Sequence, residues 1–262
     1  MRPVIALLTD FGTRDHYVGA MRGVMLGVCP EATIVDITHE VDPQDVLGGA
    51  LELAAAFRYF PAGTVFLAVV DPGVGSARTG LAAEAGGFKF IAPDNGLLTM
   101  VFREAAPRKV VELTERRYAR PTISRTFEGR DRFAPAAAWL AKGIELTALG
   151  RVVSAWQTLD VPMPTATDRG VVGQVIGVDR FGNLVTNIDR RLVDRLQDAG
   201  EIEIAADGHH VTRLVATYAE AAVGSTCALI GSGDHLEIAV VGGSAAGRLG
   251  VGRGASVTLT RR

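Results

Sequence analysis

The sequence predicts two domains of different class: an α/β domain whose mixed sheet is flanked by helices, and a smaller, all-β, barrel-like domain after it. Up to about residue 150, short apolar runs alternate with stretches of helical periodicity. The segment VPMPTATDRG at 161–170 combines prolines with polar turn formers, which is typical of a linker. Beyond it, short strand-like runs are joined by Gly-rich turns. We therefore expect an α/β domain at 1–160, the linker, and a β-domain at 171–262.

The strands of the α/β domain are predicted from short apolar runs. Three buried strands are expected at 4–8, 33–37 and 64–70. The third run is apolar along most of its length, as strands covered on both faces usually are. The runs at 81–85 and 88–92 flank Gly86-Gly87, which is a hairpin signal. Because a hairpin makes its two strands antiparallel, the sheet should be mixed rather than purely parallel.

Helices are predicted between these strands. Apolar residues recur at spacings of three or four from Val18 to Val28, with Asp15 as a cap before them and Pro30 beyond the end. Asp42-Pro43 predicts the start of a second helix that runs to about Tyr59. An Ala-rich stretch predicts a further short helix at 134–141. In the β-domain, strands are expected at 171–178, 184–188, 201–205, 211–215, 227–230, 236–241 and 256–260.

The composition favours a globular protein and gives no sign of binding to nucleic acid or membranes. With 48% hydrophobic and 21% charged residues among 262, the chain is expected to be globular rather than disordered. The net charge of -2 provides no basic field for nucleic acid or an anionic membrane, which favours a small, roughly neutral partner. Cys29 and Cys227 lie far apart in apolar surroundings and are expected to be reduced core residues. The apolar run at 4–8 is too short for a signal or membrane segment, so we expect a soluble, cytoplasmic protein.

Several well-known catalytic motifs are missing. The chain has no G-x-x-x-x-G-K-[ST], G-x-G-x-x-G, H-E-x-x-H or G-x-S-x-G pattern, which removes the usual signals for P-loop, dinucleotide, zincin and hydrolase-elbow sites. The five histidines show no ligand spacing with the cysteines. A metal enzyme is therefore disfavoured, and no metal-binding residue is predicted.

Acidic residues at the expected ends of strands are the first candidates for a site. Asp10 ends the first strand, Asp71 follows the third within VVDPGVGSAR, and Asp94 follows the strand at 88–92. The carboxyl ends of strands are where α/β proteins bind ligands. The Gly-rich turn after Asp71 brings backbone N–H groups and Arg78 close to the same point. Each motif alone is equally explained as a turn, but the three together favour a site.

Two further segments combine charges with aromatic rings. In TFEGRDRF at 126–133, Glu128 and Asp131 precede the Ala-rich helix, and they are also explained as solvated partners of neighbouring arginines. In the β-domain, 179–183 (DRFGN) supplies a carboxylate, a ring and an amide, which suit a polar ligand with a flat ring. It is equally explained as a hairpin loop. Tyr218 is a second candidate ring or a core residue.

Taken together, seven motifs in order resemble the S-adenosyl-L-methionine (SAM) hydrolase family, the SAM hydroxide adenosyltransferases, which are related to fluorinases and chlorinases. They are LLTDFGTRDHYVGAMRGV, IVDITHEVDPQD, AVVDPGVGSAR, IAPDNGLL, TFEGRDRFAP, GVDRFGNLVTNI and SGDHLEIAV. The resemblance covers nearly the whole chain. It implies the two-domain fold above and a homotrimer with active sites between adjacent subunits. It also implies that water displaces methionine from C5′ of SAM, giving adenosine and L-methionine, with SAM as substrate and no cofactor.

The resemblance implies that three residues act on the water: Asp71, Arg78 seven residues later, and Glu128. Glu128 stands where the family usually carries His in T-F-H-G-R-D. A sulfonium leaves as a neutral thioether, so the reaction needs an oriented, partly deprotonated water rather than an acid. Two carboxylates beside one arginine should raise the pKa of one of them, which suits a base, while Arg78 holds the other ionised.

Substrate contacts also follow from the resemblance. Asp10 would bind the ribose hydroxyls, the rings of Phe127, Phe181 and Tyr218 would lie against adenine or the sugar, and Asn183 would read the adenine edge. The remaining positions are the backbones near Val240 and Gly242 at that edge, and Asp179, Ser232 and Glu237 around the amino-acid group of methionine. Asp15 and Tyr17 are further candidate contacts, although Asp15 is equally explained as a helix cap.

Three functions are compared. The first is hydrolysis of SAM, directed at the (R)-sulfonium epimer, and the Asp71–Arg78 spacing favours it. The second is a non-catalytic SAM- or adenosine-binding protein, which the unusual Glu128 motivates. The third is a halide-using relative. It is weaker because the halogenase branch carries Tyr at the position of Asp71, and two carboxylates would repel a halide.

Overall fold

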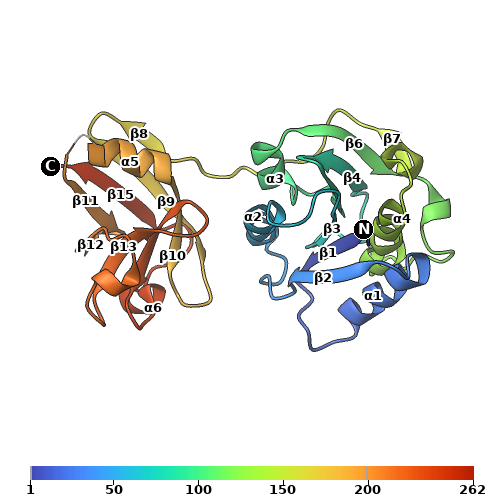
Figure 1. Ribbon diagram of the computed structural model, residues 1–262, viewed down its shortest axis with the longest axis horizontal. Helices are drawn as coiled ribbons and strands as arrows, with labels where there is room; N and C mark the ends of the chain where they lie inside the picture. Colours follow the sequence, from blue (N-terminus) through green and yellow to red (C-terminus); the bar gives the residue numbers. More distant parts are fainter. Residues whose placement is uncertain (1, 199) are drawn as a thin grey trace. The chain divides into compact units, whose positions relative to one another are not determined.

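The computed structural model describes residues 2–198 and 200–262. Its chain divides into two compact units, Met1–Asp160 and Val161–Arg262 (Figure 1). The first unit contains a mixed sheet flanked by helices, and the second contains an antiparallel, barrel-like sheet. The fold class predicted from the sequence is therefore confirmed. Each unit is described by itself below.

The sheet of the first unit is mixed. Within the described residues its strand order is β2-β1-β3-β5-β4-β6-β7. The strands are β1 (Val4–Thr9), β2 (Thr33–Thr38), β3 (Val65–Val69), β4 (Gly80–Ala85), β5 (Phe88–Pro93), β6 (Pro107–Leu113) and β7 (Gly150–Val152). Strand β1 runs parallel to β2 and β3, and β3 runs parallel to β5. Strands β4 and β5 form the predicted antiparallel hairpin across Gly86-Gly87, and β6 and β7 extend the antiparallel part.

Helices cover both faces of this sheet, because successive residues of each strand point to opposite sides. Ile5 and Leu7 of β1 pack in one core cluster with residues of α1 (Tyr17–Val28) and α4 (Ala134–Ala141). Ala6 and Leu8 pack in the other with residues of α2 (Val46–Phe57) and α3 (Thr99–Glu104). The carboxyl ends of β1 and β3 therefore emerge from a sheet that is buried on both sides.

The predicted start of the second helix is wrong, because the helix begins after Asp45 rather than at Asp42-Pro43. Helix α2 begins at Val46, and its N-cap is Asp45, whose side chain accepts a hydrogen bond from Gly48 N at 3.0 Å. Asp42-Pro43 instead opens a tight turn in which Asp45 N donates to Asp42 O. Gln44 within this turn has a φ of 68°, which is incompatible with a helix. Because Gln44 cannot be part of the helix, the N-cap is the next residue, Asp45.

The predicted cap of the first helix is also wrong. Helix α1 begins at Tyr17, its N-cap is His16, and no side chain caps it. Asp15 therefore lies before the cap position and does not cap this helix. The end of α1 at Val28, before Pro30, agrees with the prediction. Strand β6 and helix α3 were not predicted.

The sheet of the second unit is antiparallel and nearly closed. Among the described residues its order is β12-β11-β15-β9-β10-β14-β13, and β8 pairs with β9. These strands are β8 (Thr165–Thr167), β9 (Gly170–Val178), β10 (Leu184–Asp189), β11 (Ile202–Ala206), β12 (His209–Val211), β13 (Thr226–Ile230), β14 (His235–Val240) and β15 (Ser256–Arg261). Strands β12 and β13, at the two ends of this order, approach each other, and Leu214 forms a bridge with Ala228 of β13. Side chains such as Val175, Ile188 and Leu236 fill the interior.

Some details of the second unit differ from the prediction. The strand expected at 211–215 ends at Val211, and α5 (Arg190–Asp198) and α6 (Ala245–Leu249) are present in addition to the strands. Helix α5 buries Val193 and Leu196, so its apolar spacing follows the helical period. Strand β8 lies inside the segment 161–170 that was expected to be a linker.

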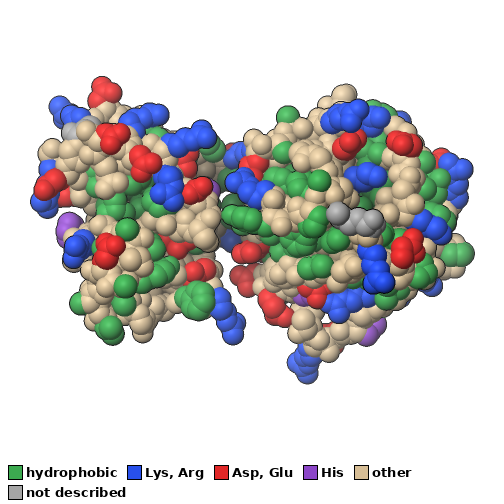
Figure 2. All heavy atoms as spheres, in the orientation of Figure 1, with side chains coloured by type: hydrophobic (Ala, Val, Ile, Leu, Met, Phe, Trp, Pro, Cys, Tyr) green, Lys and Arg blue, Asp and Glu red, His purple; other side chains and the backbone are tan. Residues whose placement is uncertain are grey.

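The described residues also bear on the cysteines, on membrane-spanning helices and on metal-ligand clusters. Cys29 and Cys227 are buried free thiols, as predicted. No helix in this part of the chain has the length and apolar character needed to cross a bilayer. No group of three or more metal-ligating side chains occurs in it either. Lys and Arg side chains are interspersed with Asp and Glu on the face seen in Figure 2.

Candidate active site

The first part of the site is the turn that follows β3. Asp71 lies two residues beyond the end of this buried strand. The chain then folds back tightly, because Ser76 N and Ser76 Oγ both donate to Gly73 O, at 3.1 and 2.7 Å. Ser76 Oγ in turn accepts a hydrogen bond from Arg78 N at 3.1 Å. This turn directs the side chain of Arg78 back toward Asp71.

A close backbone approach holds the turn against the segment that carries Glu128. Gly75 has a φ of +78°, and a Cβ at this position would lie 2.4 Å from the carbonyl oxygen of Arg125. Glycine is therefore required both by its conformation and by the space available. The same contact brings the 71–78 turn and the 125–128 segment together.

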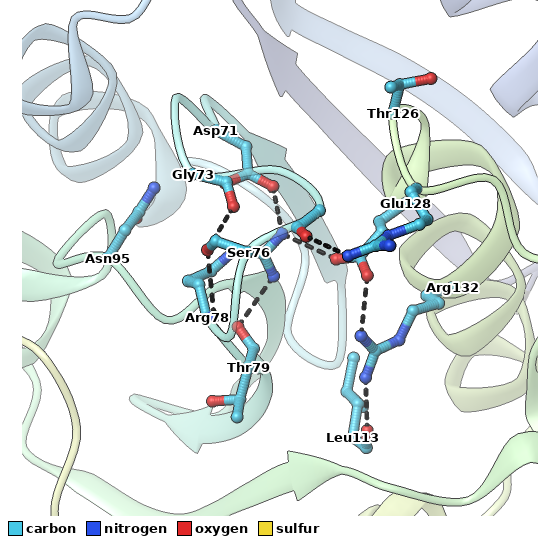
Figure 3. A network of polar contacts seen from close by, with 12 residues as sticks. Asp71, Gly73, Ser76, Arg78, Thr79, Asn95, Leu113, Thr126, Glu128 and Arg132 are labelled. Carbon is cyan, nitrogen blue, oxygen red and sulfur yellow. Dashed lines mark hydrogen bonds and ion pairs between the residues drawn. The ribbon is translucent and has the colours of Figure 1, made fainter.

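Arg78 connects both carboxylates. Its Nη2 donates to Asp71 Oδ2 and, at 2.7 Å, to Glu128 Oε2, while Nη1 donates to the Thr79 carbonyl at 2.9 Å (Figure 3). The ring of Phe133 lies 5.3 Å from the guanidinium. The side chains of Asp71, Arg78 and Glu128 are only 5%, 8% and 12% exposed. The structure thus brings together the three residues that the sequence singled out, although they are up to 57 positions apart in the chain.

Glu128 reaches this point at the start of a π-helical turn. The turn, Gly129–Phe133, leads directly into α4. Such turns are rare and frequent at functional sites. Arg132, four residues after Glu128, donates from Nη1 to Glu128 Oε1 at 3.0 Å and from Nη2 to Leu113 O at 2.8 Å. The sequence analysis treated the neighbouring arginines, Arg132 among them, only as solvated partners, and the four-residue spacing from Glu128 to Arg132 was the available signal for a specific pair.

Asp131, the second acid of this segment, has a structural role. It is fully buried and accepts hydrogen bonds from Ser124 N at 2.8 Å and Arg130 Nε at 2.7 Å, and it pairs with Arg120 Nε at 3.0 Å. Burial alone would raise the pKa of Asp131, but the bonds from Arg130 and Ser124 outweigh it and the pKa is lowered. The idea that Glu128 and Asp131 are solvated surface acids is therefore wrong, since both are paired and largely buried.

Asp71 differs from Asp131 in its electrostatic surroundings, because its pKa is raised rather than lowered. Burial raises the pKa of the Asp71 carboxyl above its ordinary value, and the nearby Glu128 carboxylate adds to this increase, while Arg78 opposes it. Asp71 Oδ1 is buried without a well-formed hydrogen bond among the described residues, in contrast to Oδ2. Asp71 is thus a desolvated carboxylate with one oxygen bound to arginine, and the Gly73 backbone also interacts with it.

Two other predicted site residues, Asp10 and Phe127, also belong to the first unit. Asp10 follows β1, and its Oδ2 accepts a hydrogen bond from Gln44 N at 2.8 Å. Phe127, next to Glu128, is 8% exposed and belongs to an aromatic cluster. Its ring lies 6.0 Å from Phe11 and 5.2 Å from Tyr17. Phe127 therefore packs mainly within this cluster, and only a small part of it is exposed.

Asp94 and Asn95 support the fold. Asp94 Oδ1 accepts a hydrogen bond from Gln157 N at 2.7 Å. Asn95 Nδ2 donates to Val70 O at 2.8 Å, next to Asp71 in the chain. The turn interpretation therefore holds for Asp94, and Asn95 braces the backbone that carries Asp71.

In the second unit, the 179–183 loop joins β9 to β10 and is ordered by its own aspartate. Asp179 Oδ1 accepts hydrogen bonds from Phe181 N and Asn183 N at 2.9 and 2.8 Å, and Oδ2 accepts one from Asn183 Nδ2 at 2.8 Å. Gly182 has a φ of +84° and touches Ser244 so closely that no Cβ fits. Asn183 is buried, whereas Phe181 is 78% exposed. The loop is a hairpin that holds an aromatic ring in solvent.

Tyr218 and Glu237 join this loop. Asn183 Nδ2 lies 3.4 Å from Tyr218 Oη. Burial raises the pKa of Glu237, and Asp179 adds to the increase. Burial likewise raises the pKa of Tyr218, and Glu237 contributes. The structure therefore groups Asp179, Asn183, Tyr218 and Glu237.

The remaining predicted residues lie at the ends of β14. Ser232 is exposed in the turn before this strand, next to Gly231, where a Cβ would overlap the carboxylate of Glu237. Val240 ends the strand and is 7% exposed, and its carbonyl accepts a hydrogen bond from Gly243 N at 3.0 Å. Gly242, with a φ of +73°, is exposed beyond it. Ser232 thus lies on the Glu237 side, and Val240 and Gly242 lie at the opposite end.

Comparison with known proteins now identifies the class. The family model of the SAM hydroxide adenosyltransferase N-terminal domain matches residues 5–150, and that of the C-terminal domain matches residues 173–258. The chain belongs to the SAM hydroxide adenosyltransferase family.

Individual relatives cover essentially the whole chain. An (R)-S-adenosyl-L-methionine hydrolase from Thermus thermophilus is 40% identical over 99% of this chain and 100% of its own length. A fluorinase from Actinoplanes sp. is 33% identical over 99% of this chain and 98% of its length. A crystal structure of an uncharacterized conserved protein from Thermotoga maritima has a TM-score of 0.93 and 34% identity, covering 98% of this chain and 100% of that one. The predicted membership and the predicted relation to fluorinases are confirmed.

Proposed function

We propose that this protein hydrolyses the (R)-sulfonium epimer of SAM, releasing adenosine and L-methionine. The observation that carries the proposal is the buried Asp71–Arg78–Glu128 contact. It occurs in a chain that is 40% identical, over its whole length, to a protein named (R)-S-adenosyl-L-methionine hydrolase.

The chemistry suits these three residues. Water attacks C5′, a C–O bond forms, and the C5′–S bond breaks with its electron pair going to sulfur. Since the sulfonium becomes a neutral thioether, the protein has to remove one proton from water and supply no acid. Asp71 Oδ1, the oxygen that Arg78 leaves unused, accepts that proton. The raised pKa of Asp71 makes its carboxylate a better base than that of an exposed aspartate.

We propose the substrate contacts that the family resemblance implies. Asp10 binds the ribose hydroxyls, and the rings of Phe127, Phe181 and Tyr218 contact adenine or the sugar. Asn183 and the backbones of Val240 and Gly242 read the adenine edge. Asp179, Ser232 and Glu237 surround the amino-acid group of methionine. Within this last set, Glu237 is the carboxylate suited to the α-ammonium, because both Asp179 oxygens already accept bonds from their own loop.

We further propose a cytoplasmic homotrimer with active sites between adjacent subunits and with no cofactor. The family membership supports these assignments. Mass measurement in solution tests the trimer, and a mass near that of one chain contradicts it. Turnover that survives exhaustive dialysis against a chelator is the result expected without a metal.

One assay tests the reaction. The purified protein is incubated with SAM of mixed sulfonium configuration, and the products are separated by chromatography with chiral analysis of the remaining SAM. Adenosine and methionine are expected in equal amounts, with the (R) epimer depleted. Intact SAM after hours between pH 6 and pH 9 contradicts the proposal.

The glutamate at position 128, where the family resemblance implies a histidine, favours a second candidate function. In this alternative the protein binds SAM or adenosine without turnover. Here the expected result is tight binding by calorimetry with no adenosine. A halide-using reaction is disfavoured, because Asp71 and Glu128 place two carboxylates at one buried point. Chloride-dependent formation of 5′-chloro-5′-deoxyadenosine would revive it.

A further inference from the structure

Four charged side chains form an alternating row beside the proposed water site. Asp71, Arg78, Glu128 and Arg132 follow one another, and each neighbouring pair shares a hydrogen bond. Figure 3 shows Glu128 between the two guanidinium groups. Two carboxylates are matched by two arginines, so the row carries no net charge despite its burial. Its outer end is fixed, because Arg132 also donates to Leu113 O on β6.

Arg78 holds only one of the two Glu128 oxygens. Its Nη2 carries two N–H groups and donates one to Asp71 Oδ2 and the other to Glu128 Oε2. Glu128 Oε1 is held separately, by Arg132. The position is one where the family resemblance implies a histidine, which would need no second cation. A carboxylate there does need one.

A cavity gives Glu128 room to turn away from Arg78. It has a volume of about 380 Å³, lies on the first unit, and is lined by Glu128 and Arg132 together with residues such as Thr114 and Tyr118. Solvent in this cavity competes for the Glu128 carboxylate. The bond from Arg132 opposes this turn and helps to keep Glu128 directed at Arg78.

We propose that Arg132 is a positioning residue for the hydrolysis: it holds Glu128 against Arg78 and so leaves Asp71 as the carboxyl that takes the proton from water. This inference rests on the proposed function. Arg132 acts through Glu128 and is not assigned a contact with substrate. The charged groups facing Glu128 are Arg78 and Asp71, from the segment after β3, and Arg132 from its own π-helical turn, and Glu115 and Arg116 also line the cavity.

The first test replaces Arg132 by methionine, which keeps an unbranched apolar stem and removes the guanidinium. With SAM as substrate, Arg132→Met should lower kcat about tenfold, because a hydrogen bond to a charged group is lost, while KM changes less than about threefold. Arg151→Met is the matched control. It removes an exposed arginine that pairs with Glu112 elsewhere in the first unit, and kcat should stay within about twofold of wild type.

The pH profile supplies a readout that a merely structural role would not move. Without Arg132, Glu128 is free to turn away from Arg78, and Asp71 then loses the carboxylate that raises its pKa, so the acid limb of kcat/KM should move to lower pH. Arg132→Lys keeps the charge but cannot bind Glu128 and Leu113 O through one planar fork, and should restore only part of kcat. Thermal unfolding is measured for each variant. If Arg132→Met does not fold, Arg132→Lys and Arg132→Gln replace it in the same comparison.

A double variant separates this role from general stabilisation. In a Glu128→His background, Arg132 would face a ring that can itself become positive, so Glu128→His/Arg132→Met should be at least as active as Glu128→His. An equal loss of kcat in both backgrounds overturns the inference, and so does wild-type kcat in Arg132→Met. Absence of adenosine from the wild-type protein would instead overturn the proposed function, so the two failures are distinguishable.

Discussion

The two groups of candidate residues are built in opposite ways. In the first unit, Asp71, Arg78 and Glu128 come from separate segments, are almost fully buried, and depend on one another for charge compensation. In the second unit, the 179–183 loop is organised within five residues by Asp179, and its ring, Phe181, is largely exposed. Bond-making needs a fixed, desolvated base, whereas recognition of a flat ring needs an accessible surface. This difference supports the proposal that the first group carries the reaction and the second group recognises the substrate.

The largest expected effect is at Asp71. Asp71→Asn keeps the size of the side chain and removes the base, so adenosine release should fall about 100-fold or more. The measurement is initial rate at saturating SAM, with thermal unfolding to check the fold. A rate within about twofold of wild type would remove Asp71 from the mechanism and end the contrast between the two groups.

Asp179→Ala should affect recognition instead. It removes the acceptor of three hydrogen bonds within the loop, so Phe181 and Asn183 lose their fixed positions. KM for SAM should rise about tenfold while kcat changes less than about threefold. Asp194→Ala, on the exposed side of α5, is the control and should leave both constants unchanged. A fall in kcat alone would place Asp179 with the reacting groups.

Phe181→Ala tests the exposed ring by itself. Because stacking of a base on an aromatic ring contributes about 1–3 kcal/mol, KM should rise by about fivefold or more. The free energy of unfolding should change little, since the ring is exposed. Tyr59→Ala, an exposed ring of the first unit, should change neither quantity. An unchanged KM in Phe181→Ala would exclude this ring from the substrate site.

The smallest effect concerns pH. Asp71 must be ionised to act, so kcat/KM should fall as pH drops through its pKa, which lies above the ordinary 3.8. Glu128 contributes to that increase, so Glu128→Gln should shift the acid limb to lower pH. Arg132→Met should shift it in the same direction, because Glu128 then turns away from Asp71. Rate profiles of the three proteins in one buffer series measure it, and a shift to higher pH in Glu128→Gln contradicts the assignment of Asp71 as the base.

Much of the fold was predictable because it depends on local patterns. The apolar runs, the Gly86-Gly87 hairpin and the helix Ala134–Ala141 follow from spacing and turn residues, and the structure contains each of them. The start of α2 was not predictable in this way. Asp42-Pro43 and Asp45 are both acceptable caps, and the positive φ of Gln44 decides between them. Helix α5 was missed because its charged surface outweighs the two apolar residues that it buries.

By itself, the sequence determined which residue types were present at characteristic spacing: Asp71 seven residues before Arg78, Glu128 before Arg132, and the acid, ring and amide of 179–183. Only the tertiary structure decided which carboxylates are buried and which arginine each one meets. Asp131 and Glu128 are three positions apart, yet one anchors a loop and the other meets Arg78. The reason is physical: pairing of charges depends on distance and desolvation, and both arise only when separate segments pack together.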